Sequence, residues 1–115
     1  MDGDDLHEDL KIPSEKISEE VEQIVKQKLQ NERWSAKKVD GWSKDIIDAI
    51  LKMLAEMKKP YKFIVSCIIM QKNGAGLYST AGSIWNETTD GRVNYVLADY
   101  EWLFCNTTVY WAKLD

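Results

Sequence analysis

Two cysteines and one histidine are the side chains of this sequence best suited to nucleophilic or metal chemistry. Cys67 lies in the middle of the most apolar run of the chain, whereas a reactive thiol needs exposure and an electropositive neighbour. The only histidine, His7, lies in an acidic stretch far away in the sequence. Buried structural thiols are therefore the favoured interpretation of Cys67 and Cys105. An enzyme that uses Cys67 stays as an alternative, which an alkylating probe would test.

Carboxylates could supply acid–base or metal chemistry at two places. Asp45 and Asp48 lie three residues apart, but both flank an apolar helical stripe on its polar side, which favours a solvated surface. His7 with Glu8 and Asp9 follows no spacing known for metal ligands. We therefore expect no catalytic residue, no metal site and no cofactor.

A short glycine-rich stretch, Asn73-Gly74-Ala75-Gly76, could suggest a phosphate-binding loop. Such a loop needs Gly-x-x-x-x-Gly-Lys-Ser/Thr at the start of a helix. Here Leu77 and Tyr78 follow instead, at the start of a predicted strand. A hairpin turn is the favoured interpretation, because Asn-Gly accommodates the backbone of tight hairpins.

Two helices are predicted ahead of these residues, because apolar side chains recur there at helical spacing. The first runs from Ser14 to about Leu29 and the second from Ser35 to Lys59, before a proline. Both serines are expected to cap their helices. Gly41 costs the second helix about 1 kcal/mol relative to alanine, which suggests that another group approaches closely there.

Four strands are predicted over residues 61–72, 77–85, 92–98 and 102–113. Two helices and then four strands indicate an α+β domain, with both helices on one face of the sheet. The first strand is apolar on both faces, so a second layer must cover its other face. Its two sets of apolar residues are Phe63, Val65, Cys67 and Ile69 on one face, and Ile64, Ile68 and Met70 on the other. Because no further element is left in the chain, a two-fold dimer is expected.

The negative charge of the 115-residue chain is concentrated near its start, where residues 1–22 carry nine acids and two bases. We predict an acidic disordered tail over residues 1–13 and a single domain over residues 14–115. The rest is mildly basic without a Lys/Arg stripe, which argues against nucleic-acid binding. No apolar run approaches the roughly 20 residues of a membrane span, and no secretory signal is recognised. A reducing compartment is expected for the thiols.

The strand predicted over residues 77–85 differs from the others in having small side chains at its middle, from Ser79 to Ser83. One interpretation is a weak edge strand. The other is an exposed strand edge to which a peptide adds as a further strand, through main-chain hydrogen bonds. Edge strands of natural proteins usually contain Lys or Pro, which block such pairing. This segment contains neither, and the residues alone leave both interpretations open.

Residues 59–77, KPYKFIVSCIIMQKNGAGL, closely resemble the first-strand-and-turn signature of the Tctex-type dynein light chains. Trp85 followed by Thr89-Asp90-Gly91 resembles the continuation of that signature. Val39 and Trp42 match the family's pattern at the start of the second helix. The resemblance covers roughly residues 15–115 and is dense between residues 60 and 91.

This resemblance implies a non-catalytic dynein subunit with two helices and four antiparallel strands. It implies a dimer, with itself or with a related light chain, in which the second strand is exchanged between protomers. It also implies that an extended segment of the dynein intermediate chain adds to that strand beside the second helix. The implied location is the cytoplasm and cytoskeleton, or a ciliary or flagellar axoneme. A peptide-binding dimerisation hub outside dynein is the alternative.

The resemblance assigns two sets of residues by position. The peptide-binding residues of the exchanged strand are Leu77, Tyr78, Ser79, Thr80, Ala81, Gly82, Ser83, Ile84 and Trp85. The residues of the dimer interface are Phe63, Val65, Cys67, Ile69 and Trp85. Neither nucleic acid nor membrane is among the implied partners.

Overall fold

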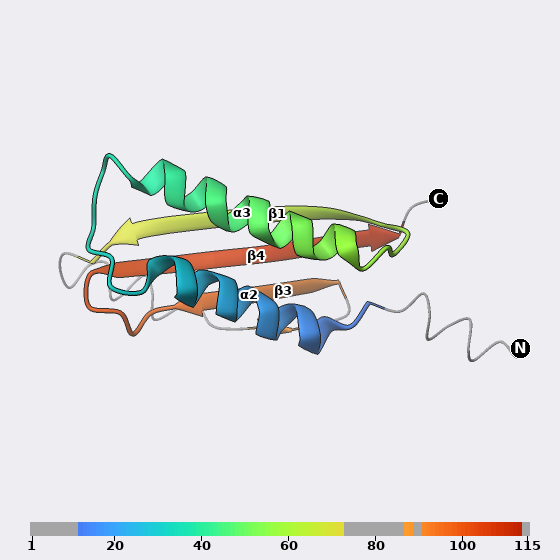
Figure 1. Cartoon of the computed structure of the whole chain (residues 1–115). Helices are drawn as coiled ribbons and strands as arrows, with labels where there is room; N and C mark the ends of the chain where they lie inside the picture. Colours follow the sequence, from blue (N-terminus) through green and yellow to red (C-terminus); the bar gives the residue numbers. More distant parts are fainter. Residues whose placement is uncertain (1–11, 73–86, 89–90, 114–115) are drawn as a thin grey trace, which may run out of the picture.

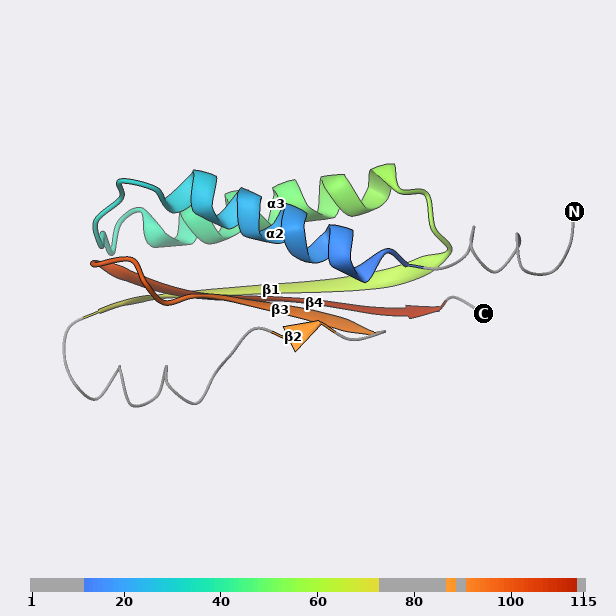
Figure 2. The same cartoon turned by 90° about the horizontal axis from the view of Figure 1, so that it is seen from below.

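The computed structural model describes residues 12–72, 87–88 and 91–113. Helices α2 (Ser14–Leu29) and α3 (Val39–Glu56) precede strands β1 (Tyr61–Gln71), β2 (Glu87–Thr88), β3 (Arg92–Leu97) and β4 (Leu103–Lys113). The two helices lie side by side over one face of an antiparallel sheet (Figures 1 and 2). This α+β arrangement agrees with the prediction, whereas the predicted strand over residues 77–85 lies outside the described residues.

Strand β4 is central, because the order of strands in the sheet is β1-β4-β3-β2. All eleven residues of β1 pair with β4, from Tyr61 opposite Lys113 to Gln71 opposite Leu103. The other side of β4 pairs with β3, from Arg92 opposite Tyr110 onward. The first and last strands of the chain are therefore neighbours, and residues far apart in the sequence share one face.

Both helices bury a regular apolar stripe, because side chains four residues apart lie on one face of a helix. Neither helix is both long and apolar enough to cross a membrane, within the part of the chain that the structure describes. The buried stripes are Ile17, Val21, Val25 and Leu29 in α2, and Trp42, Ile46, Ile50 and Leu54 in α3.

The starts of the helices differ from the prediction in their caps. Pro13 is the N-cap of α2 and Lys38 that of α3, and neither helix has a side-chain capping hydrogen bond. Ser14 is instead the first residue of α2. The carbonyl of Ser35 accepts hydrogen bonds from the amides of Lys38 and Val39, at 3.1 and 3.0 Å. A backbone turn therefore precedes α3, which begins four residues later than Ser35.

Two further expectations about the helical layer need correction. Apart from the adjacent residues and the backbone of the helix itself, no atom of the described residues lies within 4 Å of the position that a Cβ on Gly41 would take, so the expected close neighbour is absent there. Ile12, assigned to the acidic tail, is only 6% exposed and belongs to the core. Ile12 therefore packs with the helical layer, and the limits of the domain stay a prediction.

Candidate functional site

The face of the sheet opposite the helices carries three exposed apolar side chains, and we call it the open face. Ile64 is 57% exposed, Ile68 53% and Tyr110 43%. The register places Ile64 directly opposite Tyr110, so these two side chains lie together on this face. Among the described elements, no helix lies over it (Figure 2). Exposed apolar groups that gather on one face mark an association surface.

Polar groups lie between and beside these apolar side chains. Thr108 Oγ1 donates a hydrogen bond to Asn94 Oδ1 at 2.7 Å. The guanidinium of Arg92 lies 6.0 Å from the centre of the Tyr110 ring. The amide oxygen of Asn106 is buried and has no hydrogen-bond partner among the residues that the structure describes. Because a buried acceptor without a donor is costly, a donor from outside these residues would stabilise this part of the open face.

The four β1 residues assigned to the dimer interface lie under the helices rather than on the open face. They are Phe63, Val65, Cys67 and Ile69, which belong to the helix-side core or pack against it. Alternation along β1 separates two faces, but both are apolar, so the pattern does not tell which one the helices cover. The side chains on the open face are Ile64 and Ile68. Trp85, the fifth assigned residue, lies outside the described residues.

The segment assigned to peptide binding, residues 77–85, also lies outside the described residues, as do His7 and residues 73–76. Just beyond that segment, β2 pairs with β3 at one edge of the sheet, with Thr88 opposite Val93. The chain that follows the predicted binding segment therefore joins the sheet at its β3 side, whereas β1 forms the other edge.

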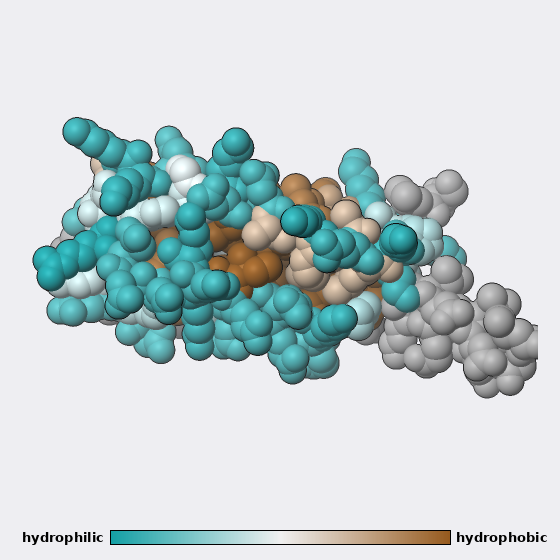
Figure 3. Space-filling view, viewed as in Figure 1, coloured by the Kyte–Doolittle hydropathy of each residue, from teal (hydrophilic) through white to brown (hydrophobic). Residues whose placement is uncertain are grey.

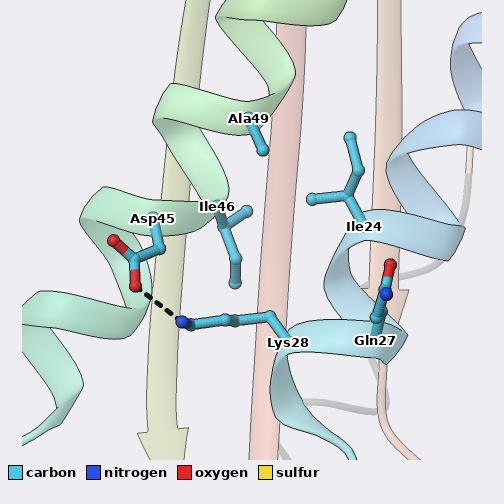
Figure 4. Close-up of a pocket in the computed structure, with 6 residues that line it drawn as sticks. All are labelled: Ile24, Gln27, Lys28, Asp45, Ile46 and Ala49. Atoms are coloured by element: carbon cyan, nitrogen blue, oxygen red, sulfur yellow. Dashed lines mark ion pairs between the residues drawn. The ribbon is translucent and has the colours of Figure 1, made fainter.

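A groove of about 310 Å³ runs between the two helices on the outer surface (Figure 3). Its walls come from both helices, and Lys28 Nζ lies 2.6 Å from Asp45 Oδ2 across it (Figure 4). The groove has an apolar floor and a charged rim, so it can hold a small apolar side chain. Among the described residues, neither a thiol nor an imidazole lines the groove. The lining residues are Ile24, Gln27, Lys28, Asp45, Ile46 and Ala49.

The predicted helix carboxylates are surface groups. Asp45 pairs with Lys28, and its side chain is 56% exposed. Asp48 is exposed too. Groups of this kind lie on the open surface and not in the enclosed pocket that a general acid or base usually occupies. This agrees with the interpretation of a solvated helix face.

A second hollow, of about 410 Å³, lies where the connection after α2 meets the connection between β3 and β4. Arg33 lies 4.9 Å from the centre of the Trp102 ring, so a cation of the chain itself already stacks on this aromatic group. The hollow has acidic and aromatic walls, formed by Gln30, Asn31, Glu32, Asp99, Tyr100, Glu101 and Trp102.

The two cysteines meet on the helix-covered face, a contact that the sequence pattern did not reveal. Cys67 Sγ lies 3.8 Å from Cys105 Sγ. Thr107 Oγ1 lies 3.6 Å from the first sulfur and 3.5 Å from the second. Strand periodicity does not specify which strands pair, and only the pairing of β1 with β4 brings these thiols together.

The surroundings shift the pKa values of the two thiols in opposite directions. Hydrogen bonds from Cys105, Thr107 and Ser43 lower the pKa of Cys67, although burial opposes the shift. The hydrogen bond to Cys67, together with burial, raises the pKa of Cys105. Among the described residues, no group of three or more His, Cys, Asp and Glu side chains could hold a metal ion.

Two helices on one face of an antiparallel sheet, with exposed apolar groups on the other face, define a small protein suited to association and binding. The family model that matches this chain is that of the Tctex-1 family, over residues 11–112. The chain therefore belongs to the Tctex-1 family.

Several similar proteins carry names of the same type. A "Dynein light chain Tctex-type" of Drosophila melanogaster is 30% identical over 107 residues, which cover 93% of this chain and 96% of the relative. A protein of the same name from Dictyostelium discoideum is 38% identical over 84 residues, or 69% and 76% of the two chains. "Dynein light chain Tctex-type 3" of Homo sapiens is 31% identical over 78 residues, or 64% and 67%. Homologues of this chain are thus dynein light chains.

Proposed function

We propose that this protein is a non-catalytic light chain of a dynein motor complex, which dimerises and binds an extended segment of the dynein intermediate chain. The observation that carries the proposal is the family match, which spans residues 11–112 and so includes both helices and most of the sheet. The proposed location is the cytoplasm and cytoskeleton, or an axoneme.

The open face supports the dimeric part of this proposal. Ile64, Ile68 and Tyr110 each leave roughly half of their surface to solvent in the single chain. Burial of apolar area contributes about 25 cal/mol per Å², so a second copy that covers these side chains would gain stability. The partner is another copy of this chain or a related light chain, with residues 77–85 exchanged between the protomers.

Residues 77–85 are the proposed binding edge for the intermediate chain. Each main-chain hydrogen bond gained contributes only about 0.5–1.5 kcal/mol net. Ordering a disordered segment costs about 2–5 kcal/mol or more. Several such bonds and a few filled pockets therefore give roughly micromolar affinity for one peptide. A dimer that holds two paired segments would gain about 100-fold or more in avidity if both sites are reached together.

Substitution in this segment tests the proposed binding edge. Thr80→Pro should abolish binding of a synthetic intermediate-chain peptide in titration calorimetry, because proline removes a main-chain donor and fixes φ. Ser79→Ala is the matched control and should weaken binding by less than about 1 kcal/mol, since it leaves the backbone donors in place. Sedimentation of Thr80→Pro must show that the variant still dimerises.

Hydrogen exchange with the peptide present locates the binding edge independently. Added protection should fall within residues 77–85. Protection confined to the acidic N-terminal residues or to β4 would contradict the proposed edge. Affinity capture from the source cells distinguishes a dynein light chain from a hub outside dynein. Dynein intermediate and heavy chains should co-purify only with a dynein light chain.

A further inference from the structure

We propose that Cys67 and Cys105 form an oxidisable dithiol site, in which hydrogen peroxide converts the two thiols into an intrachain disulfide. The pair lies on the helix-covered face, which is the side of the sheet opposite the open face. The inference therefore goes beyond the proposed light-chain function and does not depend on it.

The first support is the geometry of the two sulfur atoms. Their separation of 3.8 Å is van der Waals contact, whereas a disulfide bond measures about 2.05 Å. In the register, Cys67 stands opposite Thr107 and Cys105 opposite Ile69, so the two cysteines are diagonal neighbours on adjacent strands. Diagonal neighbours lie near the upper limit of the Cα separations that a disulfide spans. Formation of the bond therefore needs rotation of both side chains and a small approach of β1 to β4 around this pair.

The second support is the unequal exposure of the thiols. Cys105 is completely buried on the central strand, whereas Cys67 is only partly buried. Cys67 lies on β1, which forms an edge of the described sheet. A small oxidant therefore reaches Cys67 first, and Cys105 is held in contact behind it.

The third support is the set of donors around Cys67. The Cys105 thiol, the Thr107 hydroxyl and the Ser43 hydroxyl all favour the thiolate of Cys67, which lowers its pKa. The thiolate is the nucleophilic form of cysteine. These donors reach Cys67 from both layers, since Ser43 belongs to α3 and the other two residues to β4.

The reaction has two balanced steps. The Cys67 thiolate attacks one oxygen of hydrogen peroxide, the O–O bond breaks, and the products are the Cys67 sulfenic acid and hydroxide, which takes up the proton that Cys67 released. The Cys105 sulfur then attacks the Cys67 sulfur. The S–S bond forms, the S–O bond breaks, and the departing hydroxide leaves as water with the Cys105 proton. Two thiols are oxidised to one disulfide, and one peroxide is reduced to two waters.

The test uses the reduced full-length chain, treated with hydrogen peroxide and followed by intact mass and peptide mapping. The wild type should lose the mass of two hydrogen atoms per chain and yield a peptide that links Cys67 to Cys105. Cys105→Ser should instead accumulate a sulfenic acid on Cys67, which dimedone traps. A Cys67 that passes directly to sulfinic acid in the wild type, or a disulfide only between chains, would overturn the proposal.

Matched variants test the role of the donors. Thr107→Val keeps the shape of the side chain, removes one donor and should slow the loss of thiols; a change of one pKa unit alters the thiolate fraction about tenfold near neutral pH. Ser66→Ala, next to Cys67 but on the open side of β1, should leave the rate unchanged. Equal slowing by both variants would overturn the assigned role of Thr107.

Alkylation of the wild type compares the reactivity of the two thiols without any substitution, so it does not depend on whether a variant folds. Limiting iodoacetamide should label Cys67 before Cys105 in the native chain, and label both alike in denaturant. Preferential labelling of Cys105 in the native chain would overturn the assignment of Cys67 as the attacking thiol.

Discussion

The two faces of the sheet differ in their surroundings more than in their composition. Along β1, Phe63, Val65 and Ile69 lie under the helices, while Ile64 and Ile68, from the same alternating run, face away from them. The helix-covered face has its complementary layer within the described chain. The open face has none among the described elements, and we propose that a second copy supplies it.

This difference suggests that the two faces serve separate purposes. Side chains on the helix-covered face should determine the stability of the fold, because α2 and α3 bury their apolar stripes against it. Side chains on the open face should determine association and contribute less to the folding of one chain. Substitutions matched between the two faces can therefore test whether stability and association are divided in this way.

The largest expected effect on stability is at the centre of the helical layer. Ile50 is completely buried, so Ile50→Ala should lower the free energy of unfolding by about 2–5 kcal/mol through lost burial and the cavity left behind. Asp48→Ala, on the exposed side of α3, is the control and should stay within about 0.5 kcal/mol. Urea melts at a fixed protein concentration would measure both. A larger loss of stability in Asp48→Ala than in Ile50→Ala would mean that the side of α3 facing the sheet does not contribute to the core.

A tyrosine on the helix-covered face should make stability depend on alkaline pH. Burial, and then nearby Glu22 and Asp99, raise the pKa of Tyr95 well above its ordinary value. The unfolded chain therefore loses this proton first, and stability falls as pH rises beyond about 10, by at most about 1.4 kcal/mol per pH unit.

Removing the Tyr95 hydroxyl should remove that part of the pH dependence. Stability of Tyr95→Phe, measured by urea melts between pH 9 and about 11, should fall less steeply than that of the wild type. Parallel curves for the two proteins would show that Tyr95 ionises equally easily in the folded and unfolded chains.

The smallest effect is expected on the solvent side of α3. A Cβ at Gly41 would meet open space, so Gly41→Ala should stabilise the chain by about 0.5–1 kcal/mol through helix propensity and a less flexible unfolded state. Thermal melts would show a higher midpoint, while the association constant should not change. A loss of stability would mean that this part of α3 has a close neighbour after all.

Much of the fold could be predicted from the sequence, because local patterns specify local structure. Helical spacing placed Ile50 at the centre of a buried stripe, and alternation set the limits of β1 and β4 within about a residue. The predicted start of the first helix at Ser14 is confirmed, whereas α3 begins four residues after Ser35. Neither serine is an N-cap, because Pro13 and Lys38 occupy those positions.

What the sequence could not predict depends on tertiary pairing. Alternation along β1 shows two apolar faces, and only the packing of the helices tells that Cys67 lies under them and Ile64 does not. Likewise, Cys67 and Cys105 lie 38 positions apart in the sequence, and only the register of β1 with β4 brings their sulfurs together. The predicted peptide-binding segment, residues 77–85, remains a prediction of sequence and family.

Sedimentation equilibrium on three proteins tests whether the open face binds a second copy of the chain. The wild type should give twice the 13.3 kDa chain mass at micromolar concentration. Ile64→Lys should raise the dissociation constant roughly thirtyfold or more, a cost of about 2 kcal/mol for a charge placed in the buried interface. Leu51→Lys, an equivalent change at an exposed leucine of α3 (40% exposed), should leave the dimer intact. A folded wild-type monomer, or a dimer that Leu51→Lys weakens and Ile64→Lys does not, would show that the open face is not the dimer interface.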